Sequence, residues 1–240
     1  MMELVLYLSK DSDNFRTVKP PPLGEISEDV VRVTLELTAE NIEKLREKVK
    51  NDSPARSQLH LSTFVIAYAY SWTCVVKARG GNPNRQVNFL YLADFRHRLD
   101  PKVPATYSGS CVFPMGWFDY EARTFLEEDG FVKAVEIHND SVKGLGSRGI
   151  ESLCNEYVQG MKKIKPGSQF GKVAGSNRFG VYVTDFGWGR PAKTEFVSTD
   201  PEAFCISERR DEAGGVEMGV CLKKSEMEIF LSLFKNGLSD

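Results

Sequence analysis

The sequence predicts an α/β fold in two layers, a mixed β-sheet with helices packed against it. Three observations predict this architecture. First, residues 31–37 alternate between apolar and polar side chains, as in a strand, and are followed directly by apolar residues at helical spacing. Second, an almost wholly apolar helix over 62–79 precedes a buried strand. Third, a pair of strands comes before a C-terminal amphipathic helix. Strands and helices alternate without any internal repeat or low-complexity tract, which favours one mixed sheet flanked by helices.

The N-terminal third begins with a stretch that we expect to be an extended linker. Residues 1–28 lack clear periodicity and contain the run Lys19-Pro20-Pro21-Pro22, and proline favours extended structure. The strand over 31–37 follows, with Thr38 placed to cap the next helix. One face of that helix is predicted to be apolar, through Ile42, Leu45 and Val49.

The most apolar element is a helix that Ser62 and Thr63 open and that ends near Arg79, before Gly80-Gly81. It is apolar on nearly every side, so we expect it to be buried, although it is too short to span a membrane. The next apolar run, Val87–Ala93, is predicted to be a buried strand that leads into the loop Asp94–Pro101.

The C-terminal half is predicted to contain two helices, then strands, then a last helix. The helices are expected over residues 130–143 and 150–162. Gly214-Gly215 is expected to join the last two strands in a hairpin, and Ser225 and Gly237 are expected to start and stop the final helix. The expected strands cover residues 179–184, 194–198, 203–208 and 216–222.

Composition narrows the class of protein. The chain is 41% hydrophobic and 27% charged, as is ordinary for a soluble protein. Its net charge of −2 does not indicate the excess of basic residues that is typical of nucleic-acid binding. The apolar run Leu4–Leu8 is too short for a signal peptide or a membrane span. The cysteine count is five, an odd number, and no two cysteines form a C-x-x-C pair, so we expect reduced core residues in a cytoplasmic protein without a metal site.

The stretch Thr184–Pro191 reads Thr-Asp-Phe-Gly-Trp-Gly-Arg-Pro and is the most distinctive motif of the chain. Gly187 and Gly189 bracket Trp188, so the backbone on either side of the indole can take positive φ or approach another segment closely. On chemistry alone, the motif is typical of a tight inter-strand loop with one packed tryptophan.

Four stretches together resemble the C-terminal half of a plant BAHD acyl-CoA-dependent acyltransferase. Asp185–Gly189 matches the DFGWG signature, Leu61–Trp72 is similar to the central helix of the C-terminal domain, and Asp94–Leu99 fits D-x-R-x-R-L. Tyr107–Cys111 resembles the Y-F-G-N-C of the branch that malonylates anthocyanins and phenolic glucosides. In this stretch serines 108 and 110 replace the usual Phe and Asn. The second family signature, HxxxD, occurs nowhere in the chain.

The resemblance implies a fold, a reaction and a division of the chain. It implies a domain like chloramphenicol acetyltransferase over residues 29–240, with 1–28 as the remnant of an inter-domain crossover and the N-terminal HxxxD domain absent. The implied activity is O-acyl transfer, with malonyl-CoA as co-substrate, no permanent cofactor and a small phenolic glycoside as acceptor. A separate N-terminal half could supply the missing base; the alternative is a catalytically silent truncated paralogue that serves as a binding module.

The three histidines offer no catalytic candidate. His60 precedes a helix start, His97 lies between two arginines, and His138 falls on an exposed-looking helix position. Although His97 and Asp100 come one residue short of HxxxD, no histidine has a nucleophile at a recognisable spacing. We therefore expect all three to be structural or solvent-facing, and no catalytic residue is assigned.

Two further expectations concern binding and structure. A helix N-terminus suits a phosphate, and the resemblance places Ser62 and Thr63 along the CoA channel, whereas the alternative for both is a plain N-cap. The resemblance also implies a structural ion pair between Asp185 and Arg96 that fixes the Gly187-Trp188-Gly189 loop. If that pair is buried, Asp185→Ala is expected to cost roughly 3 kcal/mol.

Overall fold

The computed structural model describes residues 29–104, 106–195, 203–210 and 213–239. The predicted linker over 1–28, with its run Leu4–Leu8, lies outside the described residues.

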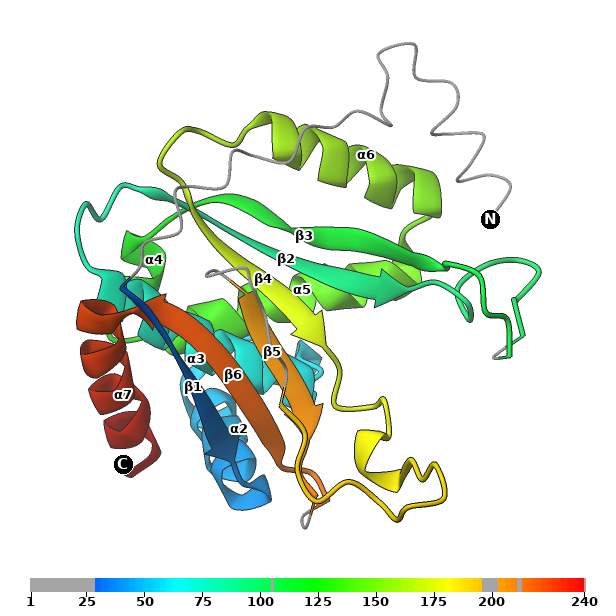
Figure 1. The fold of residues 1–240 in the computed structure, drawn as a ribbon. Helices are drawn as coiled ribbons and strands as arrows, with labels where there is room; N and C mark the ends of the chain where they lie inside the picture. Colours follow the sequence, from blue (N-terminus) through cyan, green and yellow to red (C-terminus); the bar gives the residue numbers. More distant parts are fainter. Residues whose placement is uncertain (1–28, 105, 196–202, 211–212, 240) are drawn as a thin grey trace.

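The described chain forms a six-stranded mixed sheet with strand order β1-β6-β5-β4-β2-β3 (Figure 1). Strands β2, β4 and β5 are parallel to one another, whereas β3, β6 and β1 join antiparallel. The predicted mixed sheet with packed helices is therefore confirmed. The strands are β1 (Val30–Leu37), β2 (Gln86–Asp94), β3 (Val112–Glu121), β4 (Gln169–Gly175), β5 (Ala203–Glu208) and β6 (Val216–Lys223).

The helices α2, α3 and α5 lie behind the sheet in Figure 1, while α6 lies along the edge strand β3. Tyr157 of α6 packs its ring against Phe113 and Phe118 of β3 at centroid distances of 5.5 and 6.0 Å. The helices are α2 (Ala39–Asp52), α3 (Thr63–Arg79), α4 (Arg123–Leu126), α5 (Gly130–Ser147), α6 (Ile150–Lys162) and α7 (Lys224–Ser239), with 3₁₀ turns η2 (Arg56–Gln58) and η3 (Val181–Val183).

The centre of the core is α3, whose apolar sequence suits burial on every side. Its Trp72 contacts Phe89 of β2 edge-on at 5.6 Å, and Phe89 stacks on Trp117 of β3 at 5.6 Å. Gly171 of β4 lies against this group, because a Cβ there would come within 2.5 Å of the Phe89 ring and 2.8 Å of Trp72. The predicted burial of this helix is confirmed.

The cap of α2 also agrees with the sequence prediction. The Thr38 hydroxyl accepts a bond from the Asn41 amide at 3.0 Å, and the Asn41 side-chain oxygen accepts one from the Thr38 amide at 3.1 Å. This reciprocal pair is a capping box, which satisfies amides that have no partner inside the helix. The apolar face of α2 is buried as expected, through Ile42, Leu45 and Val49.

One strand prediction in the C-terminal half needs correction, and another lies mostly outside the described residues. Residues 179–184 form no strand, because Gly180 adopts a left-handed conformation (φ 67°) and starts the 3₁₀ turn η3. Thr194 and Glu195 are irregular, and the rest of the expected strand over 194–198 lies outside the described residues. The strands expected over 203–208 and 216–222 are confirmed as β5 and β6.

The limits predicted for the last helix were wrong. Helix α7 begins at Lys224 directly after β6, so Ser225 lies inside its first turn and does not cap it. The helix also continues past Gly237 to Ser239. Gly237 serves packing instead, since a Cβ there would approach the Tyr70 hydroxyl to 2.6 Å while that hydroxyl donates to the Phe234 carbonyl at 2.5 Å.

Candidate functional site

Most of the residues singled out in the sequence lie at one end of the sheet. Strands β2 and β4 are parallel, so the loops that follow them leave the sheet at the same end, where the carboxyl ends of these strands lie (Figure 1). The start of α3 is at that end too, because Phe64 in its first turn contacts the ring of Tyr91 near the end of β2 at 5.6 Å. This end of the sheet is therefore the candidate functional region, as in other sheets with parallel strands.

The start of α3 combines a helix N-terminus with a guanidinium. The Ser62 hydroxyl caps the helix by accepting from the Val65 amide at 3.3 Å, and the first helical bond runs from the Ile66 amide to the Ser62 carbonyl at 3.0 Å. The amides of Thr63 and Phe64 come before the first helical hydrogen bond, so they have no acceptor within the helix. They lie at the positive end of the helix dipole. The predicted capping role of Ser62 is confirmed, and Thr63 is the first helical residue.

Arg46 of α2 is a site residue that the sequence analysis missed. Its guanidinium donates to the Thr63 hydroxyl at 3.2 Å and to the Leu61 carbonyl at 2.9 Å, and it pairs with Glu43 at 2.8 Å. The hydrogen bond from Arg46 lowers the pKa of Glu43 below its ordinary value. A positive charge thus lies beside the start of α3, where it adds to the attraction for an anion.

Arg96 holds together the loop that joins β2 to β3. Its amide and its guanidinium each donate to the Asp94 carboxylate at 2.9 Å, and its Nε donates to the Tyr107 carbonyl at 3.3 Å. Partial burial raises the pKa of Asp94, but the two hydrogen bonds from Arg96 outweigh it, so the pKa is lowered. The stretch Tyr107–Cys111 is held next to the end of β2 in this way.

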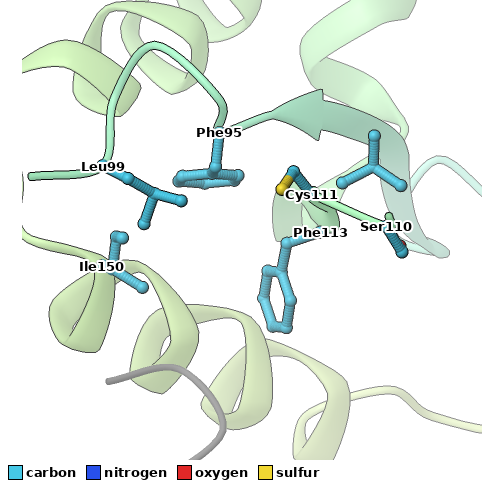
Figure 2. Close-up of a pocket in the computed structure, with 7 residues that line it drawn as sticks. Phe95, Leu99, Ser110, Cys111, Phe113 and Ile150 are labelled. Carbon is cyan, nitrogen blue, oxygen red and sulfur yellow. The ribbon is translucent and has the colours of Figure 1, made fainter. Parts of the chain in front are cut away.

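A small apolar hollow, with a cavity volume of about 30 Å³, opens beside these loops. Figure 2 shows Phe95, Leu99 and Ile150 across the hollow from Cys111 and Phe113. Neither a lysine, an arginine nor a carboxylate is among its lining residues, so it suits an uncharged, apolar group. The complete lining is Phe95, Leu99, Ser110, Cys111, Val112, Phe113 and Ile150.

The predicted ion pair between Asp185 and Arg96 is absent from the structure. The Asp185 carboxylate accepts from the amides of Gly187 and Gly189 at 2.7 and 3.0 Å, while Arg96 pairs with Asp94. Each group has a partner within four residues of it in the chain, which explains the correction. The expected packing of Trp188 was also wrong, since its side chain is 94% exposed.

None of the three histidines is arranged as a general base. His60 and His97 are exposed, and in the described part of the chain neither imidazole is hydrogen-bonded to a carboxylate that would orient it. His138 is buried rather than exposed, and its Nδ1 donates to the Ala134 carbonyl at 2.8 Å. Burial lowers the pKa of His138 to about 4, despite that hydrogen bond, so the imidazole is neutral and enclosed at pH 7.

Other kinds of site were sought among the described residues. No group of three or more His, Cys, Asp or Glu side chains there could hold a metal ion. No helix of the described segments has both the length and the apolar character that crossing a membrane requires. All five cysteines are buried and none is paired in a disulfide, so their predicted place in the core is confirmed.

Comparison with known proteins gives the family. The model of the Transferase family matches residues 11–236. Phenolic glucoside malonyltransferase 2 of Arabidopsis thaliana is 54% identical over 99% of this chain and 52% of its own length. Agmatine coumaroyltransferase of the same plant is 54% identical over 98% of this chain and 52% of its own length. The chain therefore spans about half the length of the curated relatives it matches.

Solved structures share the fold. Vinorine synthase superposes with a TM-score of 0.68 at 19% identity, over 86% of this chain and 48% of that one. TRI101 of F. sporotrichioides, solved with coenzyme A and T-2, gives 0.61 at 14% identity, over 90% of this chain and 53% of that one. The predicted chloramphenicol acetyltransferase-like fold is thereby confirmed. With the family model matched over nearly the whole chain, this protein belongs to the Transferase family of BAHD acyltransferases.

Proposed function

We propose that residues 29–240 are the C-terminal, CoA-binding domain of an enzyme that transfers a malonyl group to a hydroxyl of a phenolic glycoside, with residues 1–28 as the remnant of the crossover between domains. Support for the acyl group comes from similarity to a malonyltransferase over 99% of the chain. Similarity to a coumaroyltransferase at the same identity makes p-coumaroyl-CoA the donor to test against malonyl-CoA. The five free cysteines suit a reducing, cytoplasmic setting.

The observation that carries the binding proposal is the start of α3. Ser62 caps the helix, the amides of Thr63 and Phe64 precede the first helical bond, and the Arg46 guanidinium lies against Thr63. Phosphate is attracted by the helix dipole and by unpaired amides, and arginine adds charged hydrogen bonds. We therefore assign the phosphates of acyl-CoA to this position.

Acyl transfer requires a general base, and none of the three histidines of this chain is oriented to act as one. The acceptor hydroxyl attacks the thioester carbonyl while a general base takes the hydroxyl proton. The C–S bond then breaks, and the base returns the proton to the leaving sulfur, which releases the CoA thiol. The resemblance assigns the base to the histidine of an HxxxD motif, which this sequence lacks. We infer that the isolated chain binds acyl-CoA without turning it over, and that a separate N-terminal half supplies the histidine.

A silent binding module is the second candidate. It is favoured by Ser108 and Ser110, which stand where the resemblance implies Phe and Asn, together with the missing HxxxD. The two candidates differ in one observable. The first requires malonyl transfer when this chain is co-expressed with the N-terminal half of the Arabidopsis malonyltransferase, whereas the second requires acyl-CoA binding without transfer in the same preparation.

The binding site can be tested by measuring malonyl-CoA affinity of the chain by calorimetry. Arg46→Gln removes a guanidinium that pairs with Glu43 at 2.8 Å. Arg123→Gln is the matched control, because Arg123 pairs with Glu121 at 2.8 Å and lies near Pro83, beyond the C-terminal end of α3 rather than at its start. We expect Arg46→Gln to weaken binding at least about tenfold, since a charge-assisted hydrogen bond contributes about 1.5–3 kcal/mol, and Arg123→Gln to leave the affinity unchanged. Equal affinities for the two variants would refute the assignment of the phosphates.

A further inference from the structure

The two edge strands of the sheet, β3 and β1, differ in how their outer sides are protected. Strand β3 contains Pro114 and Gly116, and its register with β2 is interrupted by an irregularity. Helix α6 lies along it, with the ring of Tyr157 at 6.0 Å from that of Phe118 (Figure 1). Proline, irregular register and a covering helix are devices that keep an edge strand from pairing with another chain, so the β3 edge is protected.

Strand β1, at the other edge, has neither proline nor glycine and is strongly β-forming in composition. Within the described residues it pairs with β6 alone, in an uninterrupted register over its eight residues (Figure 1). Half of the backbone N–H and C=O groups of such a strand point away from the sheet, where they can pair with a further strand. Its apolar side chains are not fully covered, since Val31 is exposed and Val33 and Leu35 are only partly buried. The β1 edge is therefore suited to pairing.

The polar side chains of β1 share one face, because successive side chains of a strand point to opposite faces. Arg32, Thr34 and Glu36 lie on the face opposite the helices. Arg32 and Thr34 contact the Glu195 carboxylate at 3.5 and 3.3 Å, and Arg209 contacts Glu36 at 2.9 Å. Ion pairs at partly exposed positions contribute little, so these charged groups can take further partners at small cost.

The order of residues in β1 is self-complementary when two copies pair antiparallel around Thr34. In that register Arg32 of each copy lies opposite Glu36 of the other, and the two Thr34 side chains lie opposite each other. On the other face, Val33 of each copy lies opposite Leu35 of the other. Pairs of opposite charge, pairs of threonines and pairs of apolar side chains all stabilise neighbouring antiparallel strands. Each kind of residue thus meets a suitable partner.

Other symmetric registers of the same two strands are less favourable. Pairing around Arg32 would place two guanidinium groups opposite each other, and pairing around Glu36 would do the same with two carboxylates. Like charges directly opposite each other are destabilising. Pairing around Val33 or Leu35 would leave both charged residues opposite uncharged ones. The charge pattern of β1 therefore selects the register around Thr34.

We propose that two copies of this chain associate through β1, antiparallel and centred on Thr34, so that their two sheets join into one continuous sheet. The same strand is used by both copies, so the contact is isologous and closes at two molecules. The protected β3 edge keeps the joined sheet from growing further. This association is independent of the proposed function, because Ser62, Thr63 and Arg46 are not among the residues that pair.

The test is sedimentation velocity of the purified 240-residue chain over a range of concentrations, in which we expect a dimer that dissociates on dilution. Arg32→Glu and Glu36→Arg each place like charges opposite one another twice, and each should weaken association about tenfold or more. The double variant Arg32→Glu/Glu36→Arg restores opposite charges and should associate like the wild type. An equimolar mixture of the two single variants should form a mixed dimer. Arg123→Glu is the matched control, since Arg123 follows β3 at the other edge and pairs with Glu121.

The register is tested separately by Thr34→Cys. The two introduced thiols lie directly opposite each other, with Cβ atoms about 5 Å apart, so oxidation with copper phenanthroline should link the two copies. Arg32→Cys should give no link, because Arg32 lies opposite Glu36. The five natural cysteines are buried and provide the background, measured with the wild-type chain. A monomer at every concentration, as when another segment covers the edge, would overturn the proposal. Wild-type association of Arg32→Glu, a double variant as weak as the single ones, or a link through Arg32→Cys but not Thr34→Cys would do so as well.

Discussion

Two groups of aromatic residues in this molecule have similar composition and opposite environments. The aromatic core, made of Trp72, Phe89, Trp117, His138 and Phe204, is buried between α3, α5 and the sheet. Within it, the His138 ring lies 4.6 Å from Phe89 and 5.4 Å from Trp117. By contrast, four exposed apolar residues lie between β4 and β5, which we call the aromatic loop: Phe179, Val183, Phe186 and Trp188. Phe186 and Trp188 are almost fully in solvent.

The two groups are also held in place by different forces. In the aromatic core each ring is positioned by its neighbours, so side-chain packing determines the shape and contributes much of the stability. In the aromatic loop the backbone is positioned by hydrogen bonds to the Asp185 carboxylate and by the hydrogen bond from the Tyr182 amide to Glu208, and the exposed rings contribute little to folding. Exposed apolar residues on an ordered support are typical of a binding surface.

Equivalent truncations in the two groups give the largest expected contrast. Trp72→Ala removes a side chain with no exposed surface and leaves a cavity, so we expect it to lower the free energy of unfolding by about 3–5 kcal/mol. Trp188→Ala removes a side chain that is 94% exposed, and we expect a change within about 0.5 kcal/mol. Chemical denaturation followed by circular dichroism measures both. If the two variants lose similar amounts of unfolding free energy, Trp188 is packed against other residues of the chain in solution, and the two groups do not differ in the way described.

The buried imidazole of His138 gives the aromatic core a pH dependence that the aromatic loop lacks. The ordinary pKa of 6.5 applies to the unfolded chain, and burial lowers it to about 4 in the folded chain. Between these values the unfolded state binds a proton that the folded state does not. Above pH 6.5 His138 is neutral in both states and does not destabilise the fold. As the pH drops from about 6.5 to about 4, the free energy of unfolding falls by about 3 kcal/mol because of His138.

The effect of His138 can be separated from that of the carboxylates, which titrate in the same range. His138→Leu removes the titrating group and keeps an apolar side chain at the position. The difference in unfolding free energy between wild type and variant should change with pH by about 3 kcal/mol between pH 7 and pH 4. A difference that stays constant over that range would show that His138 is not held neutral by burial.

Much of the fold could be predicted because several local signals agreed with the tertiary structure. Local sequence indicated the correct element in three places: α3 is apolar on nearly every side, apolar and polar residues alternate in β1, and Thr38 caps α2. Strands β3 and β4 were missed, since β3 contains Pro114 and Gly116 and β4 contains Gly171. Proline is tolerated at β3 because it is an edge strand, and Gly171 is needed where the rings of Trp72 and Phe89 leave no room.

The site was predicted less completely, because its contacts join segments far apart in sequence. Ser62 could be identified as a cap from local sequence, but Arg46 reaches Thr63 across two helices, and no local pattern indicates that. The pairing of Asp185 with Arg96 was implied by resemblance, and in this chain each residue bonds within its own loop. The conformation of residues 179–184 was set by Gly180 and Tyr182, which overrode the β-propensity of the valines.

The smallest expected effect concerns the support of the aromatic loop. Asp185→Ala removes two hydrogen bonds from the exposed tip, and since water replaces them, we expect the free energy of unfolding to fall by less than about 1 kcal/mol. A buried ion pair would instead cost roughly 3 kcal/mol on the same substitution. Hydrogen exchange gives the sharper measurement, because the amides of Gly187 and Gly189 should exchange faster in the variant while those of the aromatic core stay protected. If all amides exchange faster together, Asp185 supports the whole domain, and the loop and the core are one cooperative unit.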